Sequence, residues 1–194
     1  MHLAEIFARD TLTTDRLVLR PFTREDAPEV HRAWQDERFI ASAPVGYPYA
    51  GADLETALAW CTTGIEQRRL EGKGVGFAVV PHSGSPLVGH VSLFGADWQA
   101  RTCEIHYWTA PWARRRGYAA EAAAAVAHWA LTTQRQARIT LQVDTDNPAS
   151  RHVAERAGFR FEGILRSVAE SRTGGRADMA MYSLITEDLT PAHV

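Results

Sequence analysis

The segment APWARRRGYAAEAAAAVAHWAL, residues 110–131, joins three consecutive arginines to a glycine and an alanine-rich run. The β-like run TCEIHYWTA, residues 102–110, leads into this segment. The alanine content of residues 117–132 predicts a helix from about Gly117. The first amides of a helix have no intrahelical partner, and the helix dipole adds partial positive charge there. A strand, a short turn and a helix in this order therefore predict an anion site, and phosphate is its usual guest.

The residues at the expected start of this helix suit such a site. Gly117 permits close backbone approach and a positive φ, while Ala119 and Ala120 leave the amides uncovered. The arginines before them add attraction and potential bidentate contacts. These residues alone leave a second interpretation open, a solvated arginine run ahead of a surface helix.

Composition narrows the function classes. The chain has 194 residues, 45% hydrophobic and 23% charged, which is ordinary for a soluble protein of one domain, or two at most. A net charge of -2 and a pI of about 6.4 argue against a protein whose main partner is nucleic acid. Cys61 and Cys103 are expected to be reduced core thiols, which suits a cytoplasmic protein. No secretory signal or membrane span is expected.

Periodicity and capping signals predict a mixed α/β domain in the order β-α-α-β-β-β-α-β-α-β-β. The expected strands cover residues 16–22, 74–81, 87–95, 102–110, 137–145, 159–168 and 178–185. The expected helices cover residues 23–40, 54–72, 117–132 and 147–159. The last helix has the clearest signals, because Asn147 is a natural N-cap, Pro148 suits the first helical position and Gly158 ends it.

Four segments carry a resemblance to a known family. RRRGYA, residues 114–119, resembles the R/Q-x-x-G-x-G/A pyrophosphate loop of the GNAT acyltransferases. NPASRHVAERAGFRFEG, residues 147–163, resembles a segment of the RimJ/RimL branch, which acetylates N-terminal amines of ribosomal proteins and related targets. RLVLRPFTREDAPEV (16–30) and DMAMYSL (178–184) resemble the opening and the closing strand of that branch.

The resemblance implies a single-domain GNAT fold over residues 12–189, with terminal extensions at 1–11 and 190–194. Such a domain has a twisted, mixed, mostly antiparallel sheet, splayed centrally and flanked by about four helices, with acetyl-CoA in the cleft. The implied cofactor-binding residues are Tyr107, Trp108, Thr109, Arg114, Arg115, Arg116, Gly117, Tyr118, Ala119, Ala120 and Asn147. No metal is implied.

The chemistry requires few groups beyond the cofactor. An amine attacks the thioester, and backbone N–H groups near Tyr107 and Trp108 are candidates to stabilise the oxyanion. Glu104 is the first candidate for the base, ahead of His106 on the same strand face, although an ordinary structural role for Glu104 stays open. In the RimJ/RimL pattern the serine after NPA, here Ser150, protonates the leaving thiolate. Asn147 would bind the pantetheine as well as cap its helix.

Residues 33–49 lie where the family builds its acceptor side, so Trp34, Phe39 and Glu104 are the expected acceptor contacts. Core packing is the simpler role for Trp34. Two hypotheses remain: an acetyl-CoA-dependent N-acetyltransferase, or a catalytically silent GNAT domain that binds acyl-CoA or a protein partner. The intact loop together with Asn147 and Ser150 favours the enzyme. Its acceptor (a protein N-terminus or a small amine), the acyl group and homodimer formation stay open.

Overall fold

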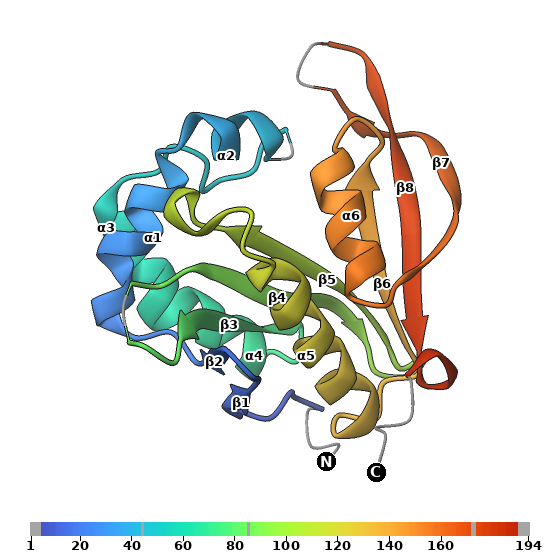
Figure 1. The fold of residues 1–194 in the computed structure, drawn as a ribbon, viewed down its shortest axis with the longest axis horizontal. Coiled ribbons are helices and arrows are strands. Elements are labelled where there is room, and N and C mark those ends of the chain that lie inside the picture. The colour runs from blue at the N-terminus through green and yellow to red at the C-terminus, as the bar shows by residue number, and fades with distance from the viewer. Residues whose placement is uncertain (1–4, 44, 85, 172–173, 190–194) are drawn as a thin grey trace.

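The computed structural model describes residues 5–189 except 44, 85, 172 and 173, so residues 1–4 of the predicted extension 1–11 and the whole predicted extension 190–194 lie outside it. Eight strands form one sheet in the order β1-β2-β3-β4-β5-β6-β8-β7 (Figure 1). The strands are β1 (Leu12–Thr13), β2 (Leu17–Arg20), β3 (Gly74–Pro81), β4 (Gly89–Asp97), β5 (Thr102–Thr109), β6 (Arg138–Asp144), β7 (Arg160–Glu170) and β8 (Arg176–Ile185). The predicted α/β class and GNAT-type sheet are confirmed.

The sheet divides between β5 and β6. All neighbouring strands pair antiparallel except these two, which run parallel. Their pairing covers only three positions and ends where Glu104 lies opposite Thr140. Beyond that point β6 stays paired with β8, while β5 stays paired with β4. The two halves of the sheet therefore diverge and leave one edge of β5 free, as the central splay of the family requires.

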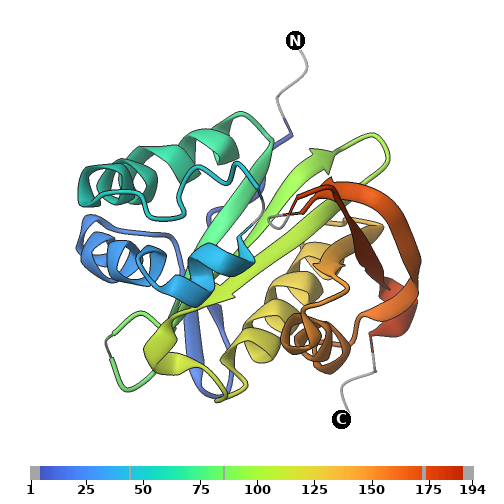
Figure 2. The ribbon, with the colours of Figure 1, turned by 90° about the horizontal axis from the view of Figure 1, so that it is seen from above.

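Helices cover both faces of the sheet. They are α1 (Ala27–Trp34), α2 (Glu37–Ser42), α3 (Leu54–Ala59), α4 (Ile65–Leu70), α5 (Tyr118–Thr132) and α6 (Pro148–Arg156). Figure 2 shows α1, α3 and α4 on one face, with α5 and α6 on the other. The alanines of α5 let it lie close against the sheet, where Ala123, Val126, Ala127 and Ala130 are completely buried.

Two predicted helices are divided in the structure, so the helices exceed the expected number of about four. The predicted helix 23–40 breaks at Asp36, whose extended backbone (ψ 127°) ends one helix and caps the next. The predicted helix 54–72 contains a π-helical turn, Trp60–Gly64. The hydroxyls of Thr62 and Thr63 there donate to carbonyls four residues earlier, a bonding pattern that often bends helices.

The segment before β1 packs against the domain. Phe7, which falls within the predicted extension 1–11, is fully buried and packs on Trp98 at a ring-centroid distance of 4.7 Å. Asp10 accepts a 2.8 Å hydrogen bond from the indole N–H of Trp129, near the end of α5. Residues 7–10 are therefore part of the folded domain, together with the strands that follow them.

Candidate active site

The loop between β5 and α5 presents free backbone amides. After a 3-10 turn at Pro111–Ala113, Arg115 and Gly117 both take positive φ, 64° and 79°. The first backbone hydrogen bond of the helix runs from the Glu121 N–H to the Gly117 carbonyl at 3.2 Å. The N–H groups of residues 118–120 therefore precede the helical bonding pattern and point out of the helix start. The backbone amides and the helix dipole therefore have the arrangement that the predicted anion site requires.

The three arginines of the loop have different surroundings. Arg115 and Arg116 are exposed, with side chains free to approach an anion. Arg114 instead directs its guanidinium to the carboxylate of Asp36 at the start of α2. The side chain of Arg114 is therefore engaged within the protein, and the anion-binding role of the loop falls on its backbone and on the two exposed arginines.

Arg16, just before β2, braces the same loop from the other side. Its Nη1 donates to the Arg116 carbonyl at 3.0 Å, and its Nε donates to Glu121 at 2.7 Å. Glu121 also accepts a 2.6 Å bond from the Thr14 hydroxyl, so this carboxylate links the loop to the segment before β2. Arg16 therefore fixes the loop at its entry to α5 and keeps the amides in one arrangement.

The free edge of β5 offers backbone groups to the gap in the sheet. The Ala110 N–H donates to the Val88 carbonyl, and backbone groups of an antiparallel strand alternate between its two edges. Trp108 therefore directs its N–H and carbonyl toward β4, whereas Tyr107 and Thr109 direct theirs toward the gap. The Trp108 carbonyl lies 2.5 Å from where a Cβ on Gly89 of β4 would stand, in agreement with this assignment.

Side chains of β5 alternate between two differently equipped faces. Glu104, His106 and Trp108 point to the face covered by α1–α4, where His106 lies 6.1 Å from Tyr47, ring to ring. Tyr107 points to the opposite face and reaches Ser150 on α6. Because β5 and β6 have already separated at this level, the gap joins the two faces. A group held in the gap is thus exposed to Glu104 and His106 on one side and to Ser150 on the other.

Glu104 stands where β5 and β6 part. Its Oε2 accepts a 3.2 Å hydrogen bond from Gln142 of β6. Burial raises the pKa of Glu104 above its ordinary value, and the hydrogen bond from Gln142 opposes that rise. A carboxylate with a raised pKa is a stronger base than an exposed glutamate, so its position and its pKa both suit proton abstraction.

His106 is a second titratable group on this face, and its lowered pKa makes it a weaker base than Glu104. Burial lowers its pKa to about 4, so the imidazole is neutral near pH 7. His90 of β4, whose Nδ1 lies 3.1 Å from the Phe77 carbonyl, is likewise kept neutral by burial, with a pKa of about 3. The two rings lie 6.4 Å apart and contribute polar nitrogens without charge.

Aromatic side chains wall the same face. Phe39 of α2 packs edge-on against Trp108 at 6.0 Å and against Tyr47 at 6.2 Å. Trp34, an expected acceptor contact, is fully buried and stacked on Tyr49 at 5.0 Å, so it supports the wall from behind. The expectation that Trp34 touches the acceptor is therefore not supported by its position, whereas Phe39 and Tyr47 stand nearer the gap.

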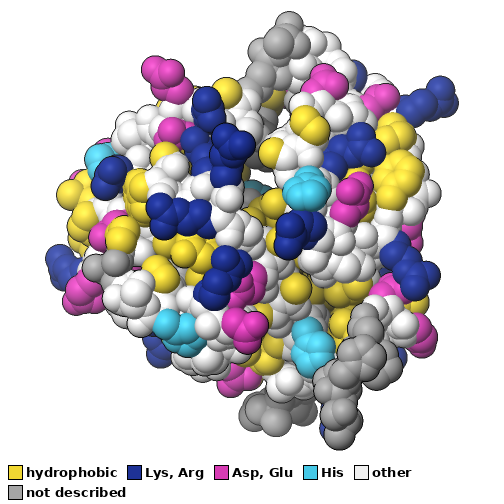
Figure 3. Space-filling model, in the orientation of Figure 1, with side chains coloured by type: hydrophobic (Ala, Val, Ile, Leu, Met, Phe, Trp, Pro, Cys, Tyr) yellow, Lys and Arg dark blue, Asp and Glu magenta, His cyan; other side chains and the backbone are white. Residues whose placement is uncertain are grey.

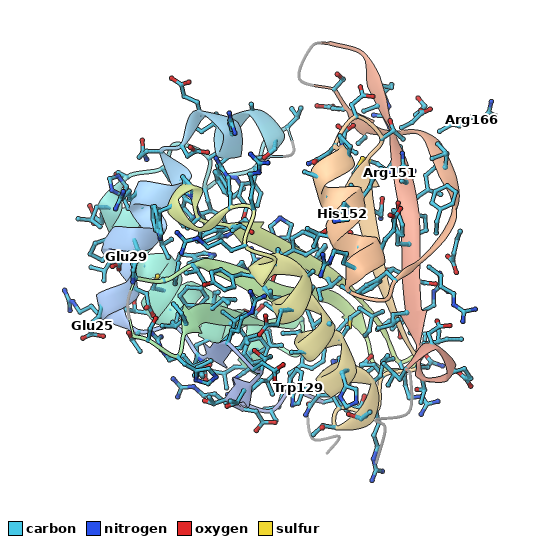
Figure 4. The ribbon with its side chains drawn as sticks, in the orientation of Figure 1. Glu25, Glu29, Trp129, Arg151, His152 and Arg166 are labelled. Atoms are coloured by element: carbon cyan, nitrogen blue, oxygen red, sulfur yellow. The ribbon has the colours of Figure 1, made fainter. Side chains whose placement is uncertain are left out.

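Ser150 and Asn147 meet the gap from α6. The Asn147 side chain accepts the Ser150 backbone N–H at 3.0 Å, which is the predicted N-cap. The Ser150 hydroxyl lies 2.9 Å from the Tyr107 hydroxyl, which also donates to the Ser150 carbonyl at 3.0 Å. In Figure 4 Arg151 and His152 mark this helix beside the gap. Figure 3 shows a hollow between the α2 and α6 sides, with basic side chains on both margins.

Comparison with known proteins identifies the family. The model of the acetyltransferase (GNAT) domain matches residues 16–160. The chain belongs to the GNAT acetyltransferase family. It is therefore an acyltransferase, and the gap between β5 and β6 is the splayed centre of a GNAT domain.

Individual relatives refine this assignment. The GNAT chain is 26% identical over 178 residues to the uncharacterized N-acetyltransferase YoaA of Bacillus subtilis (strain 168), covering 90% of this chain and 96% of YoaA. It is 30% identical over 101 residues to the ribosomal-protein-serine acetyltransferase of Escherichia coli (strain K12), covering 52% and 56% of the two chains. Mycobacterium smegmatis RimJ, solved with CoA-disulfide, has the same fold, with a TM-score of 0.81, 24% identity and coverage of 95% and 90%. The predicted resemblance to the RimJ/RimL branch is confirmed.

Several residues of this GNAT domain were missed by sequence reasoning. Asp36 and Arg16 are ordinary charged residues in sequence, and only the fold brings them to the phosphate loop. The sequence indicated a role for the Tyr107 backbone only, and the contact of its hydroxyl with Ser150 was not predicted. Tyr47 lies in GYPY, a turn-like stretch whose two tyrosines were an available signal. Within the described residues, no cluster of three or more His, Cys, Asp or Glu is placed to hold a metal.

Proposed function

We propose that this GNAT domain transfers an acetyl group from acetyl-CoA to a primary amine, by direct attack in a ternary complex. The observation that carries the proposal is the gap between β5 and β6. It joins a face with Glu104 and His106 to a face with Ser150, and the free amides of residues 118–120 lie where β5 leads into α5. Amine and leaving thiol can therefore occupy opposite faces of one opening.

The residues present fit the donor. Its pyrophosphate would lie on the amides of residues 118–120, with Arg115 and Arg116 supplying charge. Its pantetheine would follow the free edge of β5 and pair with the Tyr107 carbonyl and the backbone groups of Thr109, as a peptide strand would. The Tyr107 N–H would then be available to stabilise the carbonyl oxygen as negative charge develops there.

Glu104 is our candidate for the base. On the face that it shares with His106, it would take the proton released when the amine attacks the thioester carbon, directly or through one water. An α-amino group has an ordinary pKa of about 8 and a lysine about 10.4, so an α-amine requires less assistance.

Ser150 is our candidate for the proton donor to the departing thiolate. Its hydroxyl proton can be shared with the Tyr107 hydroxyl at 2.9 Å, or turned toward the gap. Burial raises the pKa of Tyr107 to about 12, so this hydroxyl stays protonated and keeps its hydrogen bond with Ser150. Asn147 holds the first turn of α6 and so places Ser150.

The acceptor that we favour is the N-terminal α-amine of a protein, with a small-molecule amine as the alternative. The support is the resemblance to the RimJ/RimL branch and the similarity to the ribosomal-protein-serine acetyltransferase.

We also propose that the protein is cytoplasmic, because Cys61 and Cys103 are both unpaired and buried, as expected in a reducing compartment. No helix in the described part of the chain has the length and apolar character needed to cross a bilayer.

The test is release of CoA, followed with a thiol reagent across N-terminal peptides, polyamines, amino acids and lysine derivatives. We expect acetyl-CoA to bind and CoA to be released with at least one class of acceptor, most rapidly with peptides that carry a free α-amine. Binding of acetyl-CoA without release for any acceptor would favour the catalytically silent domain. Failure to bind acetyl-CoA would contradict the proposal altogether.

Replacement of Glu104 by Gln tests the base. We expect kcat to fall by about hundredfold, the lower end of the usual range for general base catalysis, with little change in CoA affinity. The base must be ionised, so wild-type kcat should fall as the pH drops through a pKa above the ordinary 4.5 of a glutamate. The pH profile of kcat checks this, because E104Q should lose that acidic limb. An unchanged limb in E104Q would assign it to another group.

A further inference from the structure

One ion pair joins the loop between β5 and α5 (residues 110–117, the phosphate loop) to helix α2, whose Phe39 forms the acceptor wall with Tyr47 and Trp108. The guanidinium of Arg114, the first residue of the loop motif, pairs with Asp36 Oδ1, the atom that also accepts the Phe39 N–H at 2.9 Å. Both side chains are largely buried, with exposures of 28% for Arg114 and 20% for Asp36. Burial opposes the charge, yet the hydrogen bonds from Arg114 and the Phe39 N–H keep the pKa of Asp36 below its ordinary value. The carboxylate is thus ionised and shared between the loop and α2.

The helix on the acceptor side of this ion pair has few other anchors. Helix α2 has six residues, too short to be stable alone, and Phe39 is its buried residue. The ring of Phe39 packs on Trp108 and Tyr47, and Tyr47 faces His106. Helix α2 is therefore held by its short link to α1, where the Asp36 N–H donates to the Ala33 carbonyl at 3.2 Å, by Phe39, and by the contact between Asp36 and the phosphate loop. A shift of the loop would move the wall that meets the amine.

On the cofactor side, Arg114 lies between two braced parts of the loop, and its guanidinium pairs with Asp36. The turn before it is fixed because the indole N–H of Trp112 donates to the Leu87 carbonyl at 2.9 Å. The segment after it is fixed by Arg16, through the Arg116 carbonyl and Glu121. The link between Arg114 and Asp36 therefore connects a braced loop to a weakly anchored helix, and restraint of the loop passes to α2.

We propose that Asp36 is a positioning residue that couples occupancy of the phosphate loop to the acceptor wall. CoA on the loop amides restrains Arg114, Arg114 holds Asp36, and Asp36 fixes α2 with Phe39 against Trp108. The amine then meets an ordered wall only when the donor is bound. This inference rests on the proposed binding of CoA at the loop. By linkage, the factor by which bound CoA favours the ordered state of α2 is also the factor by which an ordered α2 strengthens CoA binding.

Replacement of Asp36 by Asn isolates the ion pair. Asn is as good an N-cap as Asp, so the bond to the Phe39 N–H and the start of α2 are retained while the charge is lost. The matched control is Glu37→Gln, which removes the same charge from the neighbouring exposed residue in the first turn of α2. Backbone hydrogen exchange over residues 37–43 and CoA affinity by calorimetry are measured for wild type, D36N and E37Q, each with and without CoA.

In wild type and E37Q we expect saturating CoA to slow exchange over residues 37–43 by about fivefold or more, and in D36N by less than about twofold. CoA affinity of D36N should be about fivefold weaker, at the low end of typical coupling between sites. Equal protection in D36N and wild type, or CoA binding that leaves α2 unprotected, would overturn the inference alone. Faster exchange on adding CoA would also overturn it, because the phosphates would then draw Arg114 away from Asp36. Failure of CoA to bind wild type would overturn the proposed function as well.

Discussion

Substitution of Ser150 by Ala is expected to lower kcat by about hundredfold and to leave CoA affinity within about twofold of wild type. The hydroxyl is the group proposed to protonate the thiolate, so its loss affects the reaction more than the binding of the donor. The fold should tolerate the change, because Ser150 contributes its backbone N–H, not its side chain, to the cap formed by Asn147. Stopped-flow or steady-state release of CoA measures kcat, and calorimetry measures affinity.

The pH dependence separates proton donation from a structural role for Ser150. A thiol has an ordinary pKa of about 8.5, so a leaving thiolate is stable without a proton above that pH. The defect of S150A should therefore be largest near pH 7 and should shrink above about pH 8.5. Tyr107→Phe should lower kcat less, by about tenfold, and should add little to S150A because both hydroxyls serve one proton path. Equal losses in kcat and CoA affinity would instead indicate a structural serine.

Substitution of Gly117 by Val is expected to weaken CoA binding by about hundredfold. Gly117 has φ 79°, a conformation that costs an ordinary L-residue roughly 1–2 kcal/mol and a β-branched residue more. If the loop of the variant relaxes to avoid this backbone strain, the same free energy corresponds to a loss of about tenfold in CoA affinity. A Cβ at this position would meet only the Arg16 guanidinium, at 3.5 Å. The remaining loss is therefore expected from the side chain standing over the amides that would hold the phosphates. Calorimetric titration with CoA measures the effect.

Two companion variants make the result on Gly117 specific. Gly117→Asn should retain much more affinity than Val, since Asn tolerates positive φ. Gly84→Val places the same side chain on another glycine with positive φ (99°), in the turn between β3 and β4 with no atom within 4 Å of its Cβ. It should leave CoA affinity unchanged. If Gly117→Val binds CoA as well as wild type does, the phosphate-loop assignment is wrong.

The local elements of the candidate site were predictable because short-range signals encode them. Asn147, Pro148 and Gly158 mark the ends of α6, and in the structure the helix covers Pro148–Arg156, with Asn147 as its N-cap, Ala157 as its C-cap and Gly158 directly after the C-cap. Gly117 marks the start of α5, where the structure gives it a left-handed φ. The break at Asp36 was missed because a capping aspartate resembles any other aspartate inside a charged helix.

What the sequence determined by itself is the set of local parts: a turn with left-handed glycine ahead of an alanine-rich helix, a capped α6 that carries Ser150, and the family to which these motifs point. Hydrogen bonds and dihedral preferences between near neighbours encode such parts. Only the tertiary structure decided which distant groups meet. Tyr107 reaches Ser150 across 43 positions, and Arg114 reaches Asp36 across 78. These meetings depend on the side of the sheet that each element covers and on the divergence of β5 from β6, which packing of the whole chain determines.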